Sequence, residues 1–245
     1  MDKQIFDIVN QYSEHSLILT CEHAGYEIPE EYCNLGIDVK MLDTHIARDK
    51  GCKEITEKIA ENLGCFAIMG KYSRLLVDLN RRSTEDELIV KESDKVIIPK
   101  NKNVDAREYE KRLKFYYYPY YETIEKQIDY LRANGKKPII FSIHSYTPQL
   151  KGGNYRPWHA GILYHKPTKL SEYLYQGLVN NTDKNIGENV PYDLRKYNTG
   201  AVIICGEEKG LDYALIEIRD DEFVNLESGV SYWANQLIEL LKNYT

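Results

Sequence analysis

The chain has 245 residues, of which 42% are hydrophobic and 29% are charged, a balance typical of a globular protein with a sizeable buried core. Its formal net charge of -6 argues against a general binder of nucleic acids or anionic membranes, because both partners need clustered lysine and arginine. Five cysteines without metal-finger spacing and an amino terminus without a signal-peptide pattern lead us to expect a cytoplasmic protein with reduced thiols.

The first half of the chain combines strand-length apolar runs with one helical pattern. Strands are predicted at 16–21, 65–69 and 74–79, where the runs have the length of a strand buried on both faces. Apolar positions at 38–63 fit a helical period interrupted near Gly51, which would place His45 and Asp49 on one face of a helix. Residues 82–103 are polar without a clear period and predict a long surface loop.

The second half alternates helical and strand patterns. Helices are predicted at 105–134, 168–178 and from 220 to about 242, and strands at 139–143, 160–164 and 213–219. This alternation, without a repeat or a linker, predicts one α/β domain over residues 1–245 with a mixed, mainly parallel sheet flanked by helices.

Two of the predicted strands run directly into a histidine-bearing segment. His23 follows the strand at 16–21, and His144 follows the strand at 139–143. A lone histidine at a strand end commonly caps a loop, but the carboxyl ends of parallel strands share one edge of a sheet, where ligands bind. Two imidazoles at that edge suit a catalytic zinc ion, which takes three protein ligands and leaves one position for water. The candidates for the third ligand are Glu27, His45 and Asp49.

Charged residues in apolar segments suggest the rest of the site. Glu217 lies in the middle of an apolar strand, where a carboxylate is costly to bury without a partner. We expect Glu217 either to form a buried salt bridge or to act as a general base beside a metal-activated water. Arg74 and the Asn80-Arg81 pair form the cationic side, since an Asn-Arg pair at a strand end suits capture of a carboxylate, although a solvated arginine would also explain it.

Seven short motifs occur in a fixed order along nearly the whole chain. They are Leu-Thr-Cys-Glu-His-Ala-Gly-x-x-Ile-Pro, Thr-His-Ile-Ala-x-Asp-x-Gly, Tyr-Ser-Arg-Leu-x-x-Asp-x-Asn-Arg, His-Ser-Tyr-Thr-Pro, Arg-Pro-Trp-His, Asn-x-Pro-Tyr and Ile-Glu-Ile-Arg-Asp. Together they resemble the N-formylglutamate amidohydrolase family, and three of them also resemble the zinc carboxypeptidases. The resemblance implies a mixed eight-stranded sheet flanked by helices, one zinc ion and a small N-acyl amino acid as substrate.

The resemblance also implies roles, position by position. The zinc ligands would be His23, His45 and His144. Glu217 would be the general base, and Arg74 would stabilise the oxyanion. The substrate would be held by Asn80, Arg81, Arg156 and Tyr192.

The chain departs from the resembling families at two positions. Tyr26 stands where the carboxypeptidases have their ligand glutamate and Glu27 comes one residue late, which favours His45 as the third ligand. Cys205 stands where the amidohydrolase family often has a histidine, so specificity could differ. The alternatives are a hydrolase of a different N-acyl amino acid or peptide, and a metal-free binding protein on the same fold.

Overall fold

A seven-stranded mixed sheet forms the centre of the computed structural model, which describes residues 5–198 and 200–244. Its strand order is β1-β3-β2-β6-β9-β7-β8. The strands are β1 (Phe6–Val9), β2 (Leu17–Cys21), β3 (Phe66–Gly70), β6 (Ile139–Tyr146), β7 (Ala160–Leu163), β8 (Ile186–Glu188) and β9 (Asp212–Arg219). A separate hairpin pairs β4 (Glu92–Ser93) with β5 (Val96–Ile97).

Most neighbouring strands of the large sheet are parallel. β3, β2, β6 and β9 run parallel to one another, and β7 is parallel to β8. Among the described pairs of this sheet, only β1 with β3 and β7 with β9 are antiparallel. The predicted α/β fold with a mainly parallel, helix-flanked sheet is therefore confirmed, with seven strands described in this sheet where the resemblance implied eight.

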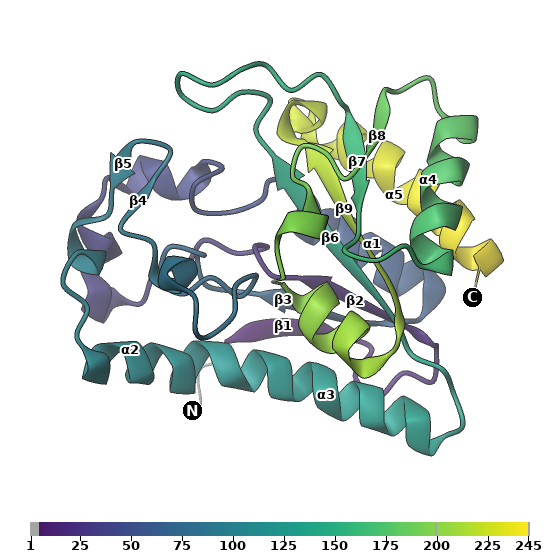
Figure 1. Cartoon of the computed structure of the whole chain (residues 1–245), viewed down its shortest axis with the longest axis horizontal. Coiled ribbons are helices and arrows are strands. Elements are labelled where there is room, and N and C mark those ends of the chain that lie inside the picture. Colours follow the sequence, from purple (N-terminus) through teal and green to yellow (C-terminus); the bar gives the residue numbers. More distant parts are fainter. Residues whose placement is uncertain (1–4, 199, 245) are drawn as a thin grey trace.

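Five α-helices cover the two faces of the sheet in the described residues (Figure 1). They are α1 (Cys52–Leu63), α2 (Ala106–Arg112), α3 (Tyr118–Ala133), α4 (Lys169–Asn181) and α5 (Leu226–Tyr244). A π-helical turn at Leu113–Tyr117 joins α2 and α3 into one long helical segment. None of the described helices is both long enough and apolar enough to cross a bilayer.

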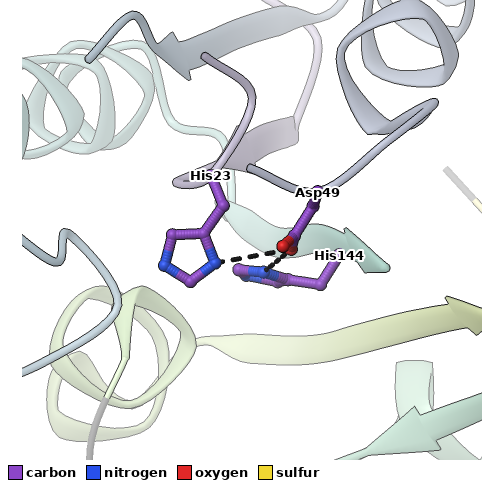
Figure 2. Close-up of side chains that lie close together, drawn as sticks. All are labelled: His23, Asp49 and His144. Atoms are coloured by element: carbon purple, nitrogen blue, oxygen red, sulfur yellow. Dashed lines mark hydrogen bonds and ion pairs between the residues drawn. The ribbon is translucent and has the colours of Figure 1, made fainter. Parts of the chain in front are cut away.

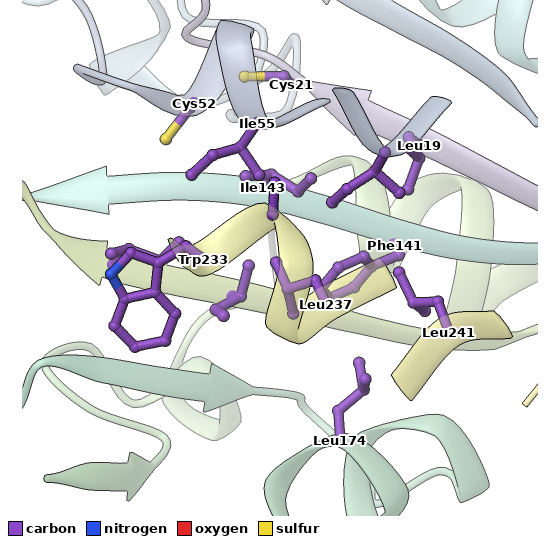
Figure 3. Packing of buried hydrophobic residues seen from close by; sticks show 14 of the residues in the cluster. Leu19, Cys21, Cys52, Ile55, Phe141, Ile143, Leu174, Trp233, Leu237 and Leu241 are labelled. Atoms are coloured by element: carbon purple, nitrogen blue, oxygen red, sulfur yellow. The ribbon is translucent and has the colours of Figure 1, made fainter. Parts of the chain in front are cut away.

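The period of two along each strand divides the apolar residues between two cores. In β6, Phe141 and Ile143 pack with Trp233 and the other apolar residues of α1, α4 and α5 (Figure 3). Ile140 faces the opposite side and joins the cluster of α3, which includes Tyr120. Continuous apolar strands were predicted for this reason, since both faces of the sheet are covered.

The predicted strand at 74–79 is wrong, because this segment forms turns rather than a ladder. Side chains within it compete for the backbone groups that a strand would use. The Ser73 hydroxyl accepts a hydrogen bond from the Leu75 amide at 3.2 Å, and Asp78 Oδ1 accepts one from the Asn80 amide at 2.8 Å. The segment therefore folds back on itself and carries Asp78 into the interior.

The interruption predicted near Gly51 is confirmed, but residues 44–49 before it are not helical, so His45 and Asp49 do not share a helix face. A short 3-10 helix covers Val39–Asp43, and α1 begins only after Gly51, whose φ of 78° lies in the left-handed region. The intervening turns are bonded to the loop after β2, where the Asp49 amide donates to the His23 carbonyl at 2.9 Å. This contact sets Asp49 beside His23.

Short elements account for the other differences from the sequence-based assignment. β1 and β8 lie outside the predicted strands, and each has at most four residues. Residues 202–206 form a π-helical turn. The surface excursion predicted at 82–103 is confirmed, with the β4–β5 hairpin inside it.

Gly25 holds the loop after β2 against the segment that follows β3. A Cβ atom added at Gly25 would lie 1.9 Å from the Lys71 carbonyl oxygen, which is far inside van der Waals contact. We expect Gly25→Ala to lower the free energy of unfolding by about 1–3 kcal/mol, measured by urea denaturation. Gly153→Ala, whose Cβ would meet Leu150 O at 3.4 Å, is the control and should change stability by less than about 0.5 kcal/mol. Equal losses in the two variants would contradict this role for Gly25.

Candidate active site

Polar side chains gather at the carboxyl ends of β2, β6 and β9, on the face of the sheet that α3 covers. His144 on β6 and Glu217 on β9 are paired across the two parallel strands, so their side chains leave the same face side by side. His23 lies two residues beyond the end of β2, the strand that neighbours β6. The two imidazoles and the acid singled out in the sequence therefore converge at one edge of the sheet.

Asp49 lies between the two imidazole rings (Figure 2). Its Oδ2 atom is 3.4 Å from His23 Nδ1 and 2.9 Å from His144 Nδ1. The ring centroids are 4.9 Å apart, and all three side chains are buried. One atom from each of these residues lies within 4.8 Å of the others, a spacing that could hold a metal ion. His23, Asp49 and His144 are called the His-Asp-His group below.

The outer nitrogen of each ring is held by a second buried carboxylate. His23 Nε2 donates to Asp78 Oδ1 at 2.6 Å, and His144 Nε2 donates to Glu22 Oε2 at 2.7 Å. Glu22 Oε2 also accepts a hydrogen bond from the Ser142 hydroxyl at 2.7 Å. Because each Nε2 carries its proton toward a carboxylate, each Nδ1 is directed at the centre of the group. Metal-binding histidines in proteins are oriented in this way.

The charge around the rings favours a cation at the centre. In the described part of the chain, the buried carboxyl groups near the rings are those of Glu22, Asp49, Asp78 and Glu217. Burial alone would lower the pKa of His144, but its hydrogen bonds to Asp49 and Glu22 raise that pKa well above its ordinary value. The carboxylates around His144 therefore stabilise positive charge at this position.

An unsatisfied nitrogen supports the same reading of the site. His23 Nδ1 is buried and makes no hydrogen bond within the described residues, although Asp49 Oδ2 is 3.4 Å away. A buried nitrogen is costly to leave without a hydrogen bond. A divalent cation bound by His23 Nδ1, His144 Nδ1 and Asp49 would satisfy this nitrogen and offset the excess of buried carboxylates. The residues present therefore fit the zinc ion that the sequence suggested.

Two of the residues considered as the third ligand lie outside the His-Asp-His group. His45 Nε2 is 3.1 Å from Asp94 Oδ2, in the turn of the β4–β5 hairpin. Glu27 Oε1 is 3.6 Å from Lys71 Nζ. The sequence favoured His45 as the third ligand, but His45 lies in a turn away from the two rings. Asp49 lies between the rings instead.

Glu217 is a buried acid with an unsatisfied oxygen. Its Oε2 atom has no hydrogen-bond partner among residues 5–198 and 200–244. Burial raises the pKa of Glu217 from 4.5 to about 7, against the opposing effect of the charge on His144. A carboxyl group with a pKa near 7 can both take and return a proton at neutral pH.

The raised pKa of Glu217 predicts how stability changes with pH in the metal-free protein. A group whose pKa is raised on folding stabilises the folded state fully below its unfolded value, and this contribution is lost as the pH rises through the folded value. Relative to Glu217→Gln, the wild type should therefore lose up to about 3 kcal/mol between pH 4.5 and pH 7. Urea denaturation of both proteins across this range measures the difference. A constant difference would contradict the pKa assigned to Glu217.

A cavity of about 300 Å³ opens directly onto the site. It is lined by His23, Arg74, Asn80, Arg81, Glu87, Ser145, Leu163, Tyr192, Leu194, Tyr197, Leu215 and Glu217. Arg74, Asn80, Arg81 and Tyr192 were all predicted to act in the site, and the structure brings them to the same cavity as His23 and Glu217.

Arg156 is absent from that lining, although the sequence suggested that it binds substrate. Its guanidinium donates to the Tyr192 hydroxyl at 3.1 Å and to the Thr147 carbonyl oxygen, and lies over the Tyr146 ring. Arg156 therefore holds the hydroxyl of Tyr192, which does line the cavity. Cys205 is also away from the cavity lining, fully buried in the cluster that α3 covers.

Both cavity arginines already have acidic partners. Arg74 Nη2 is 3.1 Å from Asp78 Oδ2, and its Nη1 is 3.7 Å from Asp49 Oδ1. Arg81 Nε is 3.5 Å from Glu87 Oε2, whose side chain is 73% exposed. Arg74 is thus fixed against the His-Asp-His group, whereas the partner of Arg81 can move away.

Glu22 and Asp78 were not identified from the sequence as site residues. Glu22 directly precedes His23, and Asp78 lies in the Arg-Leu-x-x-Asp-x-Asn-Arg motif, so both belong to motifs that the sequence analysis used. A carboxylate next to an apolar strand that ends in histidine is the signal that could have found Glu22, because a buried acid needs a partner.

Comparisons with known proteins agree with this fold. A family model described as N-formylglutamate amidohydrolase matches residues 15–224. The crystal structure of gene product Atu2144 from Agrobacterium tumefaciens is similar to this chain with a TM-score of 0.92 and 27% identity, covering 99% of this chain and 95% of that one. The crystal structure of N-formylglutamate amidohydrolase from Ralstonia eutropha JMP134 shares the fold, with a TM-score of 0.68 and 16% identity over 98% of this chain and 99% of that one. No curated protein matched the chain.

Proposed function

Because the chain belongs to the N-formylglutamate amidohydrolase family, we propose that it hydrolyses the amide bond that joins a formyl or other acyl group to the amino group of an amino acid. The observation that carries this proposal is the position of Glu217. It is a buried acid with a pKa near 7, and it lines the same cavity as a ring of the His-Asp-His group.

The His-Asp-His group would hold one zinc ion through two nitrogens and one oxygen. Imidazole nitrogen and carboxylate oxygen are ordinary zinc ligands, and three of them leave a coordination position free, as in catalytic sites. A bound zinc ion would supply Lewis acidity, which polarises an amide carbonyl and lowers the pKa of water from about 15.7 to roughly 7. Glu22 and Asp78 would keep the rings oriented through their Nε2 protons.

Glu217 would move the proton that the reaction requires. As a carboxylate it would take a proton from the attacking water, and as an acid it would give that proton to the leaving amine. Its unsatisfied oxygen is free to accept this proton, and its burial holds the pKa in the useful range. One residue thereby serves both halves of the hydrolysis.

Arg74 and Arg81 would each bind a different negatively charged group of the substrate. Arg74, fixed by Asp78 and Asp49, lies where it could stabilise negative charge developing on the amide oxygen. Arg81, together with Asn80, would bind the α-carboxylate of the amino acid. Tyr192, supported by Arg156, would line the substrate cavity.

Metal analysis and amine release test the proposal directly. The purified protein should contain about one zinc ion per chain and should release free amino acid from N-formyl or N-acetyl amino acids. A chelator should abolish this release, and zinc should restore it. Absence of hydrolysis across a panel of N-acyl amino acids, with zinc bound, would contradict the proposed function.

Glu87 competes with the substrate carboxylate for Arg81 in this proposal. Glu87→Gln should therefore lower KM by about two- to fivefold, with kcat unchanged, since an exposed ion pair contributes up to about 1 kcal/mol. Steady-state kinetics measures both constants. Glu92→Gln, which alters an exposed acid in β4, is the control. A higher KM in Glu87→Gln would show that Glu87 itself assists binding.

A further inference from the structure

One side of the substrate cavity is apolar. Leu163 on β7 and Leu215 on β9 are buried and lie directly opposite each other in the antiparallel pair. Leu215 precedes Glu217 by two residues, so both side chains lie on the same face of β9. Leu194 and Tyr197 add further apolar surface from the segment that follows β8. The apolar side of the cavity, defined by these four residues, therefore begins next to the proposed general base.

The cationic groups of the cavity are sufficient for one substrate carboxylate. In the described lining the cations are Arg74 and Arg81. Arg74 is held by two buried carboxylates, Asp78 and Asp49, and in the proposed reaction it serves the amide oxygen rather than a substrate carboxylate. Arg81 can exchange its exposed partner Glu87 for the α-carboxylate of a substrate. A second carboxylate, as in an acidic amino acid, would meet the leucines without a partner, which is costly.

Neighbouring arginines are engaged outside the cavity lining. Arg156 donates to Tyr192 and Thr147, and its guanidinium lies 4.9 Å from the centroid of the Tyr146 ring. Arg82 donates to Asn198 and forms an ion pair with Glu208 at 2.5 Å. In the described part of the chain, these contacts occupy the guanidiniums of Arg156 and Arg82, and neither residue lines the cavity.

We infer that the side chain of the amino acid substrate is apolar, as in N-acyl leucine, methionine or phenylalanine, rather than acidic. This inference rests on the proposed hydrolysis of N-acyl amino acids. The α-carboxylate binds at Arg81, the acyl amide reaches the His-Asp-His group and Glu217, and the side chain packs on Leu163, Leu194, Leu215 and Tyr197.

Rates on matched substrates test the inference. With zinc bound, kcat/KM for N-formyl-leucine should exceed that for N-formylglutamate by at least about tenfold. N-formylglutamine, which has nearly the shape of glutamate without the charge, should also be better than N-formylglutamate. A value for N-formylglutamate equal to or above that for N-formyl-leucine overturns the inference and leaves the proposed function standing.

Binding of the free amino acids separates the two ideas when no substrate is hydrolysed. Calorimetry with leucine and glutamate on the same protein reports the side-chain preference without turnover. Tighter binding of leucine supports the inference even if the proposed reaction fails, and tighter binding of glutamate overturns it.

Substitution at the cavity mouth tests which surface selects the side chain. Tyr197 is 55% exposed, so Tyr197→Arg should fold normally and should raise the glutamate-to-leucine ratio of kcat/KM by about tenfold. Tyr12→Arg, at an equally exposed tyrosine before β2, should leave that ratio unchanged. If Arg156→Gln instead lowers kcat/KM for N-formylglutamate alone, the guanidinium of Arg156 serves an acidic side chain and the inference is wrong.

Discussion

Replacing Glu217 with glutamine should lower kcat by about 10²- to 10⁴-fold, because the amide keeps the shape of the side chain but cannot accept the proton of the attacking water. Glu217 Oε2 makes no hydrogen bond in the part of the chain that the structure describes, so the substitution breaks none at that atom. The folded state should remain intact, and above pH 7 it should be more stable than the wild type because a buried charge has been removed.

Steady-state kinetics with zinc-loaded protein measures this effect, and metal analysis confirms that the variant still binds zinc. Glu57→Gln, which removes a half-exposed acid on α1 near Lys53, is the matched control and should retain full activity. Activity of Glu217→Gln within a factor of ten of the wild type would exclude Glu217 as the general base.

Replacing Asp49 with asparagine should have the second large effect, on metal binding. The substitution removes the charge that lies between His23 Nδ1 and His144 Nδ1 while keeping the size of the side chain. We expect zinc affinity to fall by at least about 100-fold, since even residues that only orient metal ligands contribute 10- to 100-fold. Activity should fall in parallel, because hydrolysis depends on the metal in this proposal.

Calorimetric zinc titration measures the affinity, and thermal unfolding with and without zinc provides an independent readout. Zinc at 100 times its Kd should stabilise the wild type by about 2.7 kcal/mol and should stabilise Asp49→Asn far less. Asp43→Asn, an exposed acid paired with Arg48, is the control from the same segment. Unchanged zinc affinity in Asp49→Asn would return His45 to consideration as the third ligand.

The sequence was most informative where local pattern and long-range packing agree. The strands β2, β3, β6 and β9 are buried on both faces, so their apolar runs were sufficient to predict them and to place His23, His144 and Glu217 at one edge. The convergence of these residues follows from strand direction alone, because parallel strands end at the same edge.

The segments between strands were less predictable because side chains, rather than periodicity, determine their course. Residues 74–79 have the apolar content of a strand, yet hydrogen bonds from Ser73 and Asp78 turn the backbone away from the sheet. The helical segment predicted through His45 is instead a turn, and the chain after it is held by the hydrogen bond from the Asp49 amide to the His23 carbonyl. A contact between residues 26 positions apart has no local signature.

The pairing of His144 with Glu217 restricts which changes of length β9 can accept in evolution. Deleting one residue within β9 upstream of Glu217 would rotate the acid toward Trp233 and α5, and would present Ile218 or Ile216 to the imidazole instead. A point substitution in β9 leaves this register unchanged. A change of length would both bury a charge among the apolar side chains and remove the proton acceptor from the site. Insertions and deletions should therefore accumulate in the excursions around the sheet and be purged from β6 and β9.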